Sequence, residues 1–294
     1  MSDYKHRLKT KIYVRMESML KKIILVPTDF SEVCANAINQ AAGAARHLQY
    51  KLVLLHVIDK NTKSFLKDEG QGGDYVEKQL DDIATNVIAD FGIEVDTVAK
   101  EGDIFTTISE VATEVDASLM YLGTHGKVGM QKLTGSYALK VVTSSPVPVI
   151  VVQKRQFDGP YKEIVFPITS DSGIWEKTEW AVHIAKQFKA TIKIYQQAGE
   201  GIDKAIAGIT SHFHKNDVKY TIDVAQKSGG FSNQVIDFAT ANNSDMILIM
   251  TNPDKGFSTF LLGSYDEEMI FNTSQIPVMC VNPRDYNWKK IVPY

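Results

Sequence analysis

The sequence predicts an α/β protein made of two tandem, doubly wound (Rossmann-like) domains, each with a five-stranded parallel sheet. Short continuous apolar segments alternate with helical patterns, which is typical of parallel strands covered by helices on both faces. The pattern then restarts, since EIVFPI at residues 163–168 resembles IILVPT at residues 23–28. Gly263-Ser264-Tyr265 likewise repeats Gly135-Ser136-Tyr137, so we expect two copies of one domain.

Composition excludes several classes of protein. The chain has 294 residues, 44% of them hydrophobic and 23% charged, which fits a soluble globular protein. A net charge of −3 gives no reason to expect nucleic acid or an anionic membrane as partner. No apolar run approaches the roughly 20 residues that span a bilayer. The two cysteines, Cys34 and Cys280, favour core packing over a disulfide, and we expect a cytoplasmic protein.

The predicted first domain covers residues 20–153. Residues 1–19 are basic, lack the apolar core of a signal peptide, and are interpreted as a leader or extension, with Met16 and Met19 as alternative starts. Strands are expected at residues 22–28, 52–58, 93–99, 117–122 and 147–152, and helices at residues 35–48, 75–91, 104–115 and 137–143. Asp29 with Glu32 resembles a capping box, and Asp103 is a natural N-cap. Residues 59–74 are interpreted as a loop, with a lid as the alternative.

The predicted second domain covers residues 162–283, after a linker at residues 154–161. Strands are expected at residues 163–168, 191–195, 218–225, 246–250 and 276–281, and helices at residues 175–188, 202–214 and 234–241. Gly263-Ser264 begins a further helix. Residues 284–294 form a tail whose aromatic side chains predict that it docks on the protein.

A glycine-containing loop follows the predicted strand at residues 117–122. Gly123 and Gly126 lie in this loop, and Gly135-Ser136 begins the next helix. Backbone N–H groups at such a helix start, together with about half a positive charge from the helix dipole, favour an anion. The pattern is neither a P-loop nor the GxGxxG fingerprint. The alternative is a glycine turn that binds nothing.

These residues resemble the nucleotide loop of the universal stress protein family, whose ATP-binding members carry Gly-x2-Gly-x9-Gly-Ser/Thr. Here Gly123-x2-Gly126 is followed by eight residues, rather than nine, before Gly135-Ser136. The resemblance covers nearly the whole chain from Leu20 and matches the tandem members of the family. It implies two domains of the adenine nucleotide alpha hydrolase-like type.

The resemblance also implies a nucleotide site in the first domain. The nucleoside is expected at Pro27, Thr28 and Asp29, with the adenine against Val57. The residues expected around the phosphates are Gly123, His125, Gly126, Lys127, Gly135, Ser136 and Tyr137. The alternatives are a helix cap for Asp29, a core position for Val57 and a solvated side chain for Lys127.

The second copy lacks the corresponding groups. When the two Gly-Ser pairs are aligned, the first-domain loop residues are replaced by Thr251, Pro253 and Asp254. Thr169 stands in the place of Asp29. Proline removes an N–H group, and aspartate repels a phosphate. We therefore expect ATP in the first domain only.

The leading hypothesis is a regulatory stress-response protein that binds ATP or another adenine nucleotide with Mg²⁺ or Mn²⁺. One alternative is an interaction module that binds no nucleotide, and another is a slow nucleotide hydrolase. His125 has no nucleophile at a fixed spacing and no carboxylate nearby in sequence, so we expect weak ATPase activity at most. His212-x-His214 does not complete a metal site.

The last strand of each domain, at residues 147–152 and 276–281, is apolar and is expected at a sheet edge. The resemblance implies antiparallel contact, because single-domain relatives dimerise through this strand. We predict an intramolecular pseudo-dimer with Val149 and Val278 near its two-fold axis. A further homodimer remains an alternative.

Overall fold

The computed structural model describes residues 22–125, 135–157, 159–169, 174–197, 202–227, 229–251 and 264–282. The elements of the first half are β1 (Ile23–Pro27), α2 (Glu32–Leu48), β2 (Lys51–Ile58), α3 (Lys60–Asp68), α4 (Tyr75–Phe91), β3 (Val95–Glu101), α5 (Ile104–Glu114), β4 (Ala117–Gly123), α6 (Gly135–Ser144) and β5 (Val149–Val152). The alternation of strands and helices expected for this half is confirmed.

The second half repeats this alternation. Its elements are β6 (Glu163–Ile168), α7 (Ile174–Phe188), β7 (Thr191–Gln196), α8 (Asp203–Lys215), β8 (Lys219–Val224), α9 (Phe231–Ala241), β9 (Met246–Met250), α10 (Ser264–Ile270) and β10 (Val278–Val281). Among the residues described, this half has no counterpart of α3. The predicted tail at residues 284–294 and the predicted leader at residues 1–19 lie outside the described residues.

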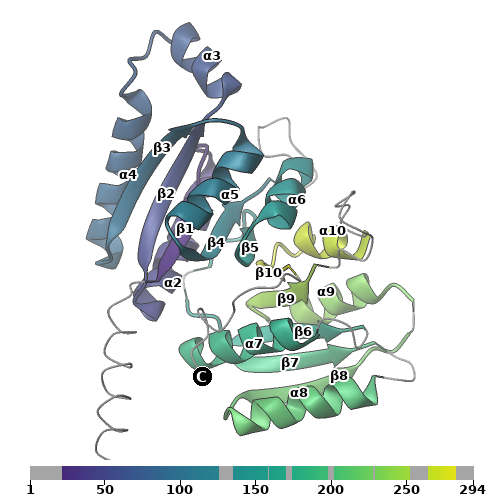
Figure 1. Ribbon diagram of the computed structural model, residues 1–294. Coiled ribbons are helices and arrows are strands. Elements are labelled where there is room, and N and C mark those ends of the chain that lie inside the picture. Colours follow the sequence, from purple (N-terminus) through teal and green to yellow (C-terminus); the bar gives the residue numbers. More distant parts are fainter. Residues whose placement is uncertain are drawn as a thin grey trace, which may run out of the picture.

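All ten strands belong to one sheet, in the order β3-β2-β1-β4-β5-β10-β9-β6-β7-β8 (Figure 1). Neighbouring strands run parallel within each half. Each half shows the same order, because β6 to β10 occupy the places that β1 to β5 occupy in the first half. The predicted α/β class with two doubly wound halves is therefore confirmed, although the two five-stranded sheets join into one.

The halves meet where β5 pairs with β10 antiparallel. The register places Ile150 opposite Met279, flanked by the pairs Val149–Cys280 and Val151–Val278. The centre of the pairing therefore lies one residue away from Val149 and Val278. Both strands are buried, and the pairing covers the edges that would otherwise face water.

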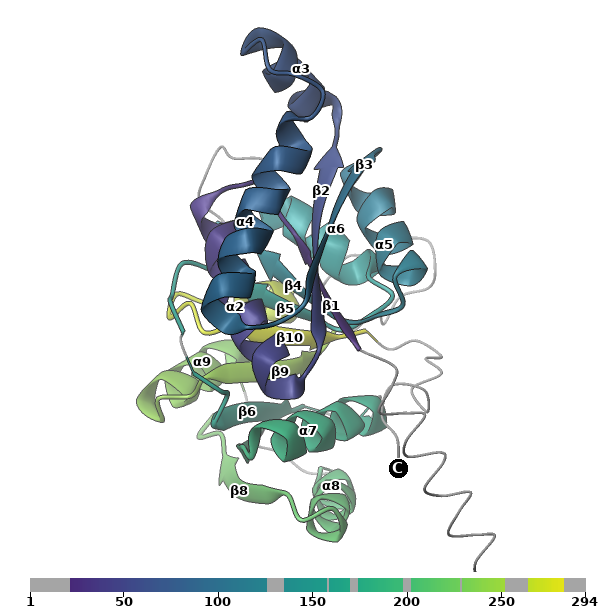
Figure 2. The same cartoon turned by 90° about the vertical axis from the view of Figure 1, so that its left-hand side faces the viewer.

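Two apolar cores lie on opposite faces of the sheet. Figure 2 shows α2 and α4 on one face of the first half and α5 and α6 on the other. Buried alanines of α2, including Ala37, Ala41 and Ala45, allow this helix to lie close to the strands. Cys34 and Cys280 are buried and free, as expected from core packing.

Two local predictions were wrong. The expected loop at residues 59–74 contains α3, whose N-cap Asp59 accepts the N–H of Thr62. The expected capping box is absent, since α2 begins after Ser31 without a side-chain cap bond. The predicted N-cap Asp103 is confirmed by bonds from the N–H groups of Phe105 and Thr106. No helix in the described part of the chain is long and apolar enough to cross a membrane.

Candidate functional site

The candidate site lies at the carboxyl ends of β1 and β4. These neighbouring strands are parallel, yet the chain leaves β1 into α2 on one face and reaches α6 on the other face after β4. Open α/β sheets bind ligands at such a switch point, in the crevice outside the strand ends. Thr28 and Asp29 follow β1, and Thr124 and His125 follow β4, so these four residues border the crevice.

Asp29 is held as a carboxylate at this crevice. Its Oδ1 accepts the N–H of Ser31 at 3.0 Å. Burial raises the pKa of the Asp29 carboxyl, but hydrogen bonds from Ser31 and Cys34 and the nearby His125 lower it more, so that the pKa falls below its usual value. Asp29 precedes the N-cap Ser31, so its carboxylate lies at the start of α2.

Gly123 brings the end of β4 against the first turn of α2. A Cβ added to this glycine would lie 2.8 Å from the carbonyl oxygen of Val33 and 3.0 Å from the Cα of Cys34. Real Cβ atoms do not approach backbone atoms so closely, so only glycine fits here without a shift. This glycine is thus required for the packing that closes one wall of the crevice.

His125 lies close enough to Asp29 to lower the pKa of its carboxyl. The Nε2 atom of His125 is buried and has no hydrogen-bond partner among the described residues. The sequence places no carboxylate near His125 in the chain, whereas the fold supplies Asp29 from a distant segment.

Thr28 and Val57 are both buried. The carbonyl oxygen of Thr28 lies 2.8 Å from Nδ1 of His56, and Thr28 Oγ1 accepts the N–H of Phe30 at 3.0 Å. Phe30 has a φ of 65° and stacks on the His56 ring at 4.5 Å, which fixes the turn after Pro27. Val57 is 8% exposed and packs in the core on the α5 and α6 face.

The phosphate end of the expected site is described only in part. Gly135 is the first residue of α6, and the side chain of Ser136 lies outside the described residues, as do Gly126 and Lys127. Tyr137 is 38% exposed and stacks on Phe105 of α5 with ring centroids 5.3 Å apart. Tyr137 therefore contacts the neighbouring helix.

Strand register shows which residues of the two halves correspond. Thr124 donates its N–H to the carbonyl of Val152, the last residue of β5, at 2.9 Å. Thr251 donates to the carbonyl of Val281, the last residue of β10, at the same distance. Thr251 therefore corresponds to Thr124, and the sequence alignment that paired it with Gly123 was wrong by one residue.

The corrected register changes the comparison of the two loops. Met250 stands in the place of Gly123, and the sequence then sets Asn252 against His125 and Pro253 against Gly126. Nine residues separate Pro253 from Gly263, compared with eight between Gly126 and Gly135. The second half keeps the loop length of the family motif but lacks its first two glycines.

The crevice of the second half contains a buried lysine. Lys177 Nζ donates to the carbonyl of Pro167 at the end of β6 at 2.5 Å and lies 4.2 Å from the ring centroid of Phe166. Burial lowers the pKa of Lys177 to about 7, against the opposing effect of Asp266. Pro167 corresponds to Pro27, so the residue in the place of Lys177 in the first half is Ala37.

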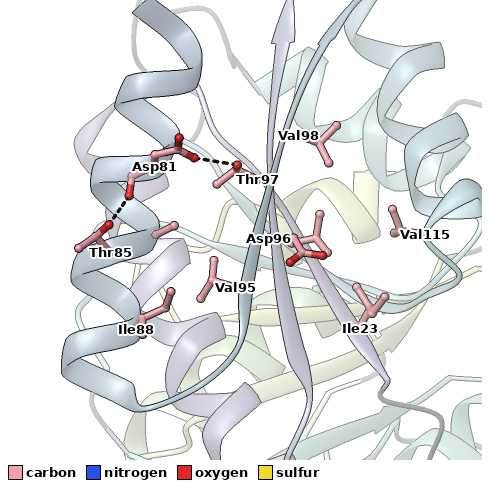
Figure 3. A pocket seen from close by; sticks show the side chains of 11 residues that line it. Ile23, Asp81, Thr85, Ile88, Val95, Asp96, Thr97, Val98 and Val115 are labelled. Carbon is pink, nitrogen blue, oxygen red and sulfur yellow. Dashed lines mark hydrogen bonds between the residues drawn. The ribbon is translucent and has the colours of Figure 1, made fainter. Parts of the chain in front are cut away.

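Two cavities lie in the first half. One of about 130 Å³ opens between α2 and α4 and is bordered by Thr28, Phe30 and Ser31 on one side. A cavity of about 720 Å³ follows the edge strand β3 (Figure 3). Among the residues described, no group of three His, Cys, Asp or Glu side chains is placed to hold a metal ion.

Comparisons with known proteins find similar chains. Residues 21–153 match the model of the universal stress protein family. A universal stress protein of Synechocystis is 34% identical over 135 residues, which cover 45% of this chain and 85% of the relative. One from Methanocaldococcus jannaschii is 29% identical over 152 residues, which cover 47% and 85%.

A solved structure extends the similarity to both halves. The crystal structure of a universal stress protein from Archaeoglobus fulgidus superposes with a TM-score of 0.71 at 18% identity. The match covers 90% of this chain and 99% of that chain. At this identity, the similarity shows the fold alone.

Proposed function

Since the chain belongs to the universal stress protein family, we propose that its first half binds an adenine nucleotide and that its second half does not. The nucleoside binds at the crevice between β1 and β4, and the phosphates lie toward the start of α6. The proposed role is regulatory, because the described residues offer binding groups rather than a completed catalytic set.

The observation that carries this proposal is the Asp29 carboxylate at the switch point, beside His125. A ribose presents hydroxyl donors, and an ionised carboxylate is the strongest acceptor that a protein side chain offers them. The lowered pKa keeps Asp29 ionised at neutral pH, so the acceptor is ready before the ligand arrives. Val57, near the carboxyl end of the neighbouring strand β2, supplies an apolar position on the α5 and α6 face.

The start of α6 supports binding of the phosphates. A helix that begins with glycine leaves N–H groups directed at an anion, and the helix dipole adds positive potential there. Few cationic side chains surround this end in the sequence, so we propose that Mg²⁺ or Mn²⁺ accompanies the triphosphate. Chelation of the metal then weakens ATP binding, and an unchanged affinity in chelator contradicts the metal complex.

We propose that the second half has no nucleotide site. Thr169 lacks the carboxylate of Asp29, and Met250 fills the place where Gly123 allows close backbone approach. Lys177 extends its ammonium to the carbonyl at the end of β6, in the region that the nucleoside occupies in the first half. An interaction module without nucleotide is the alternative, and it is distinguished by the experiment below.

The nucleotide content of freshly purified protein tests the proposal. Protein is denatured in acid, and the released nucleotides are separated and counted per chain. We expect adenine nucleotide from the wild-type chain and none from an Asp29→Asn variant. The matched control is Thr169→Asn, which places the same side chain at the corresponding position of the second half and should leave the content unchanged. If wild-type protein neither releases nor takes up adenine nucleotide, the interaction module is favoured.

A further inference from the structure

The outer edge of β3 is one end of the ten-stranded sheet. In the described part of the chain, β3 pairs only with β2, in a register from Leu52–Val95 to Ile58–Glu101. An open strand edge presents unpaired N–H and C=O groups, and proteins normally cover, twist or charge such an edge. The charged ends of β3 already have partners, since Lys100 pairs with Glu114 at 2.7 Å and Glu101 pairs with Lys63.

The cavity of about 720 Å³ extends along both faces of this edge strand. Figure 3 shows side chains from α4 and β3 on one side of the strand and side chains from β1, β3 and the end of α5 on the other. The residues on the α4 side are Asp81, Thr85, Ile88, Val95 and Thr97, and those on the other side are Ile23, Asp96, Val98 and Val115. Ala84 and Val53 also line the cavity, and they belong to the cores on opposite faces of the sheet. An added strand would therefore find a hollow for each of its two rows of side chains.

The two hollows differ in chemistry. On the α4 side, Asp81 accepts a hydrogen bond from Thr97 Oγ1 at 3.0 Å, and Ile88 is 46% exposed. This hollow combines a carboxylate with uncovered apolar surface. The other hollow is mainly aliphatic, and its one carboxylate, Asp96, is paired with Lys51. An occupant that fits both carries basic and aromatic side chains on one face and aliphatic side chains on the other.

The N-terminal segment of the chain has this pattern. Lys11, Tyr13 and Arg15 alternate with Ile12 and Val14, and β-branched and aromatic residues favour a strand. The segment is tethered beside the cavity, because Ile23, which lines it, follows only seven residues after Met16. A short tether raises the effective concentration of a segment into the millimolar range.

The direction of such a strand is fixed by its connection. Ile23 begins β1 at the amino ends of the parallel strands, so residue 15 must also lie near those ends. An added strand beside β3 lies three strand spacings from β1, which is about 14 Å. Residues 16–21 span roughly 20 Å when extended, which is sufficient. The added strand then runs antiparallel to β3.

We propose that residues 11–15 bind the edge of β3 as an additional antiparallel strand. Ile12 and Val14 occupy the aliphatic hollow, while Lys11, Tyr13 and Arg15 lie over Asp81 and Ile88. This surface is separate from the nucleotide site, since it lies along β3 and α4, whereas that site lies at the carboxyl ends of β1 and β4. The segment thereby protects the sheet edge from other chains.

Hydrogen exchange tests the proposal on the full chain and on a chain that starts at Met16. We expect the outward amides of β3 to exchange about tenfold more slowly in the full chain. The other sheet edge, β8, is the internal control and should exchange alike in both chains. Equal exchange of β3 in the two chains overturns the proposal. The proposal is also overturned if β3 still exchanges slowly without residues 1–15 and its protection increases with protein concentration. A second copy of the chain would then cover the edge.

A charge-matched pair of variants separates strand pairing from an effect of charge. Ile12→Asp with Val14→Asp places carboxylates in the aliphatic hollow and should raise β3 exchange to the rate of the shortened chain. Ser2→Asp with Tyr4→Asp adds the same charge outside the pairing segment and should leave β3 protected. An equal loss of protection in both variants contradicts a specific pairing of residues 11–15.

Discussion

Gln153 and Asn282 make equivalent contacts in opposite directions across the junction of the two halves. Gln153 follows β5, and its Nε2 donates to the carbonyls of Ile270 and Asn272 at the end of α10, at 3.4 and 3.1 Å. Asn282 follows β10, and its Nδ2 donates to the carbonyls of Val142 and Ser145 at the end of α6, at 2.7 and 3.2 Å. Each half therefore satisfies the last carbonyls of a helix in the other half.

Removal of one of these amides should loosen the junction. Gln153→Ala leaves the carbonyls of Ile270 and Asn272 buried without this donor, and we expect a loss of about 1–3 kcal/mol in the free energy of unfolding. Urea unfolding measures this loss. Gln187→Ala is the control, because the Gln187 side chain is exposed, and it should change stability by less than about 0.5 kcal/mol. Equal stability of both variants contradicts a structural role for the reciprocal contact.

A charge at the centre of the strand pairing should be more damaging. Ile150 is 1% exposed and lies opposite Met279, so Ile150→Lys buries an ammonium without a partner in the middle of the sheet. We expect a loss of at least about 3 kcal/mol in unfolding free energy, or aggregation through the opened edges. Thr221→Lys, on the exposed edge strand β8, is the control and should remain folded. A stable, monomeric Ile150→Lys protein would refute the importance of this pairing.

Acid should weaken the contact between α7 and the turn that joins α2 to β2. Burial lowers the pKa of His183 to about 4, with help from Lys22, and its Nε2 lies 3.4 Å from the hydroxyl of Tyr50. Between the usual histidine pKa of about 6.5 and this value, the unfolded chain binds a proton that the folded chain does not, so stability falls as the pH falls.

The expected size of this effect is about 2 kcal/mol of unfolding free energy lost between pH 7 and pH 5. Urea unfolding at the two values measures it, and His183→Gln should remove this part of the loss. His214→Gln changes an exposed histidine and should keep it. The same acid sensitivity in wild-type and His183→Gln protein would show that other groups cause the loss.

Substitution of Gly123 should affect both stability and binding. The Cβ of Gly123→Ala would lie 2.8 Å from the Val33 carbonyl oxygen, so β4 or α2 must shift, at a cost of about 1–3 kcal/mol. We expect ATP affinity to fall as well, because the shift moves His125 relative to Asp29. In Gly159→Ala, the nearest atom to the new Cβ is 4.0 Å away, so this control should keep stability and affinity. Thermal unfolding and titration calorimetry measure the two effects, and a neutral Gly123→Ala variant contradicts the tight packing.

The sequence predicts the central strands well because their apolar runs are buried, as in Ala117–Gly123. It does not predict α3, where Thr62 is the only buried residue and the apolar period is therefore weak. That helix is held by contacts made in the fold, including the 3.2 Å approach of Thr62 Oγ1 to Nε2 of His56. Local composition carries no record of such a contact.

The sequence predicts that the candidate site lies at the ends of strands, but it does not predict the effect of His125 on the pKa of Asp29. Asp29 and Gly123 stand out in the sequence because they follow or end buried strands. The influence of His125 on Asp29 depends on the parallel pairing of β1 with β4, which joins distant segments. The one-residue error in comparing the halves arose because the Gly-Ser pairs and the strands do not share one offset. The strand register and the bonds of Thr124 and Thr251 to the last strands reveal it.

Titration calorimetry with ATP and Mg²⁺ tests the asymmetry of the two halves most directly. Nucleotide-free full-length protein is titrated beside Gly126→Pro, which copies residue 253 of the second half into the first. The proposed asymmetry predicts one equivalent of ATP per wild-type chain and no binding by Gly126→Pro, because proline removes an N–H group from the phosphate loop. Two equivalents per chain, or unchanged binding by Gly126→Pro, would contradict it.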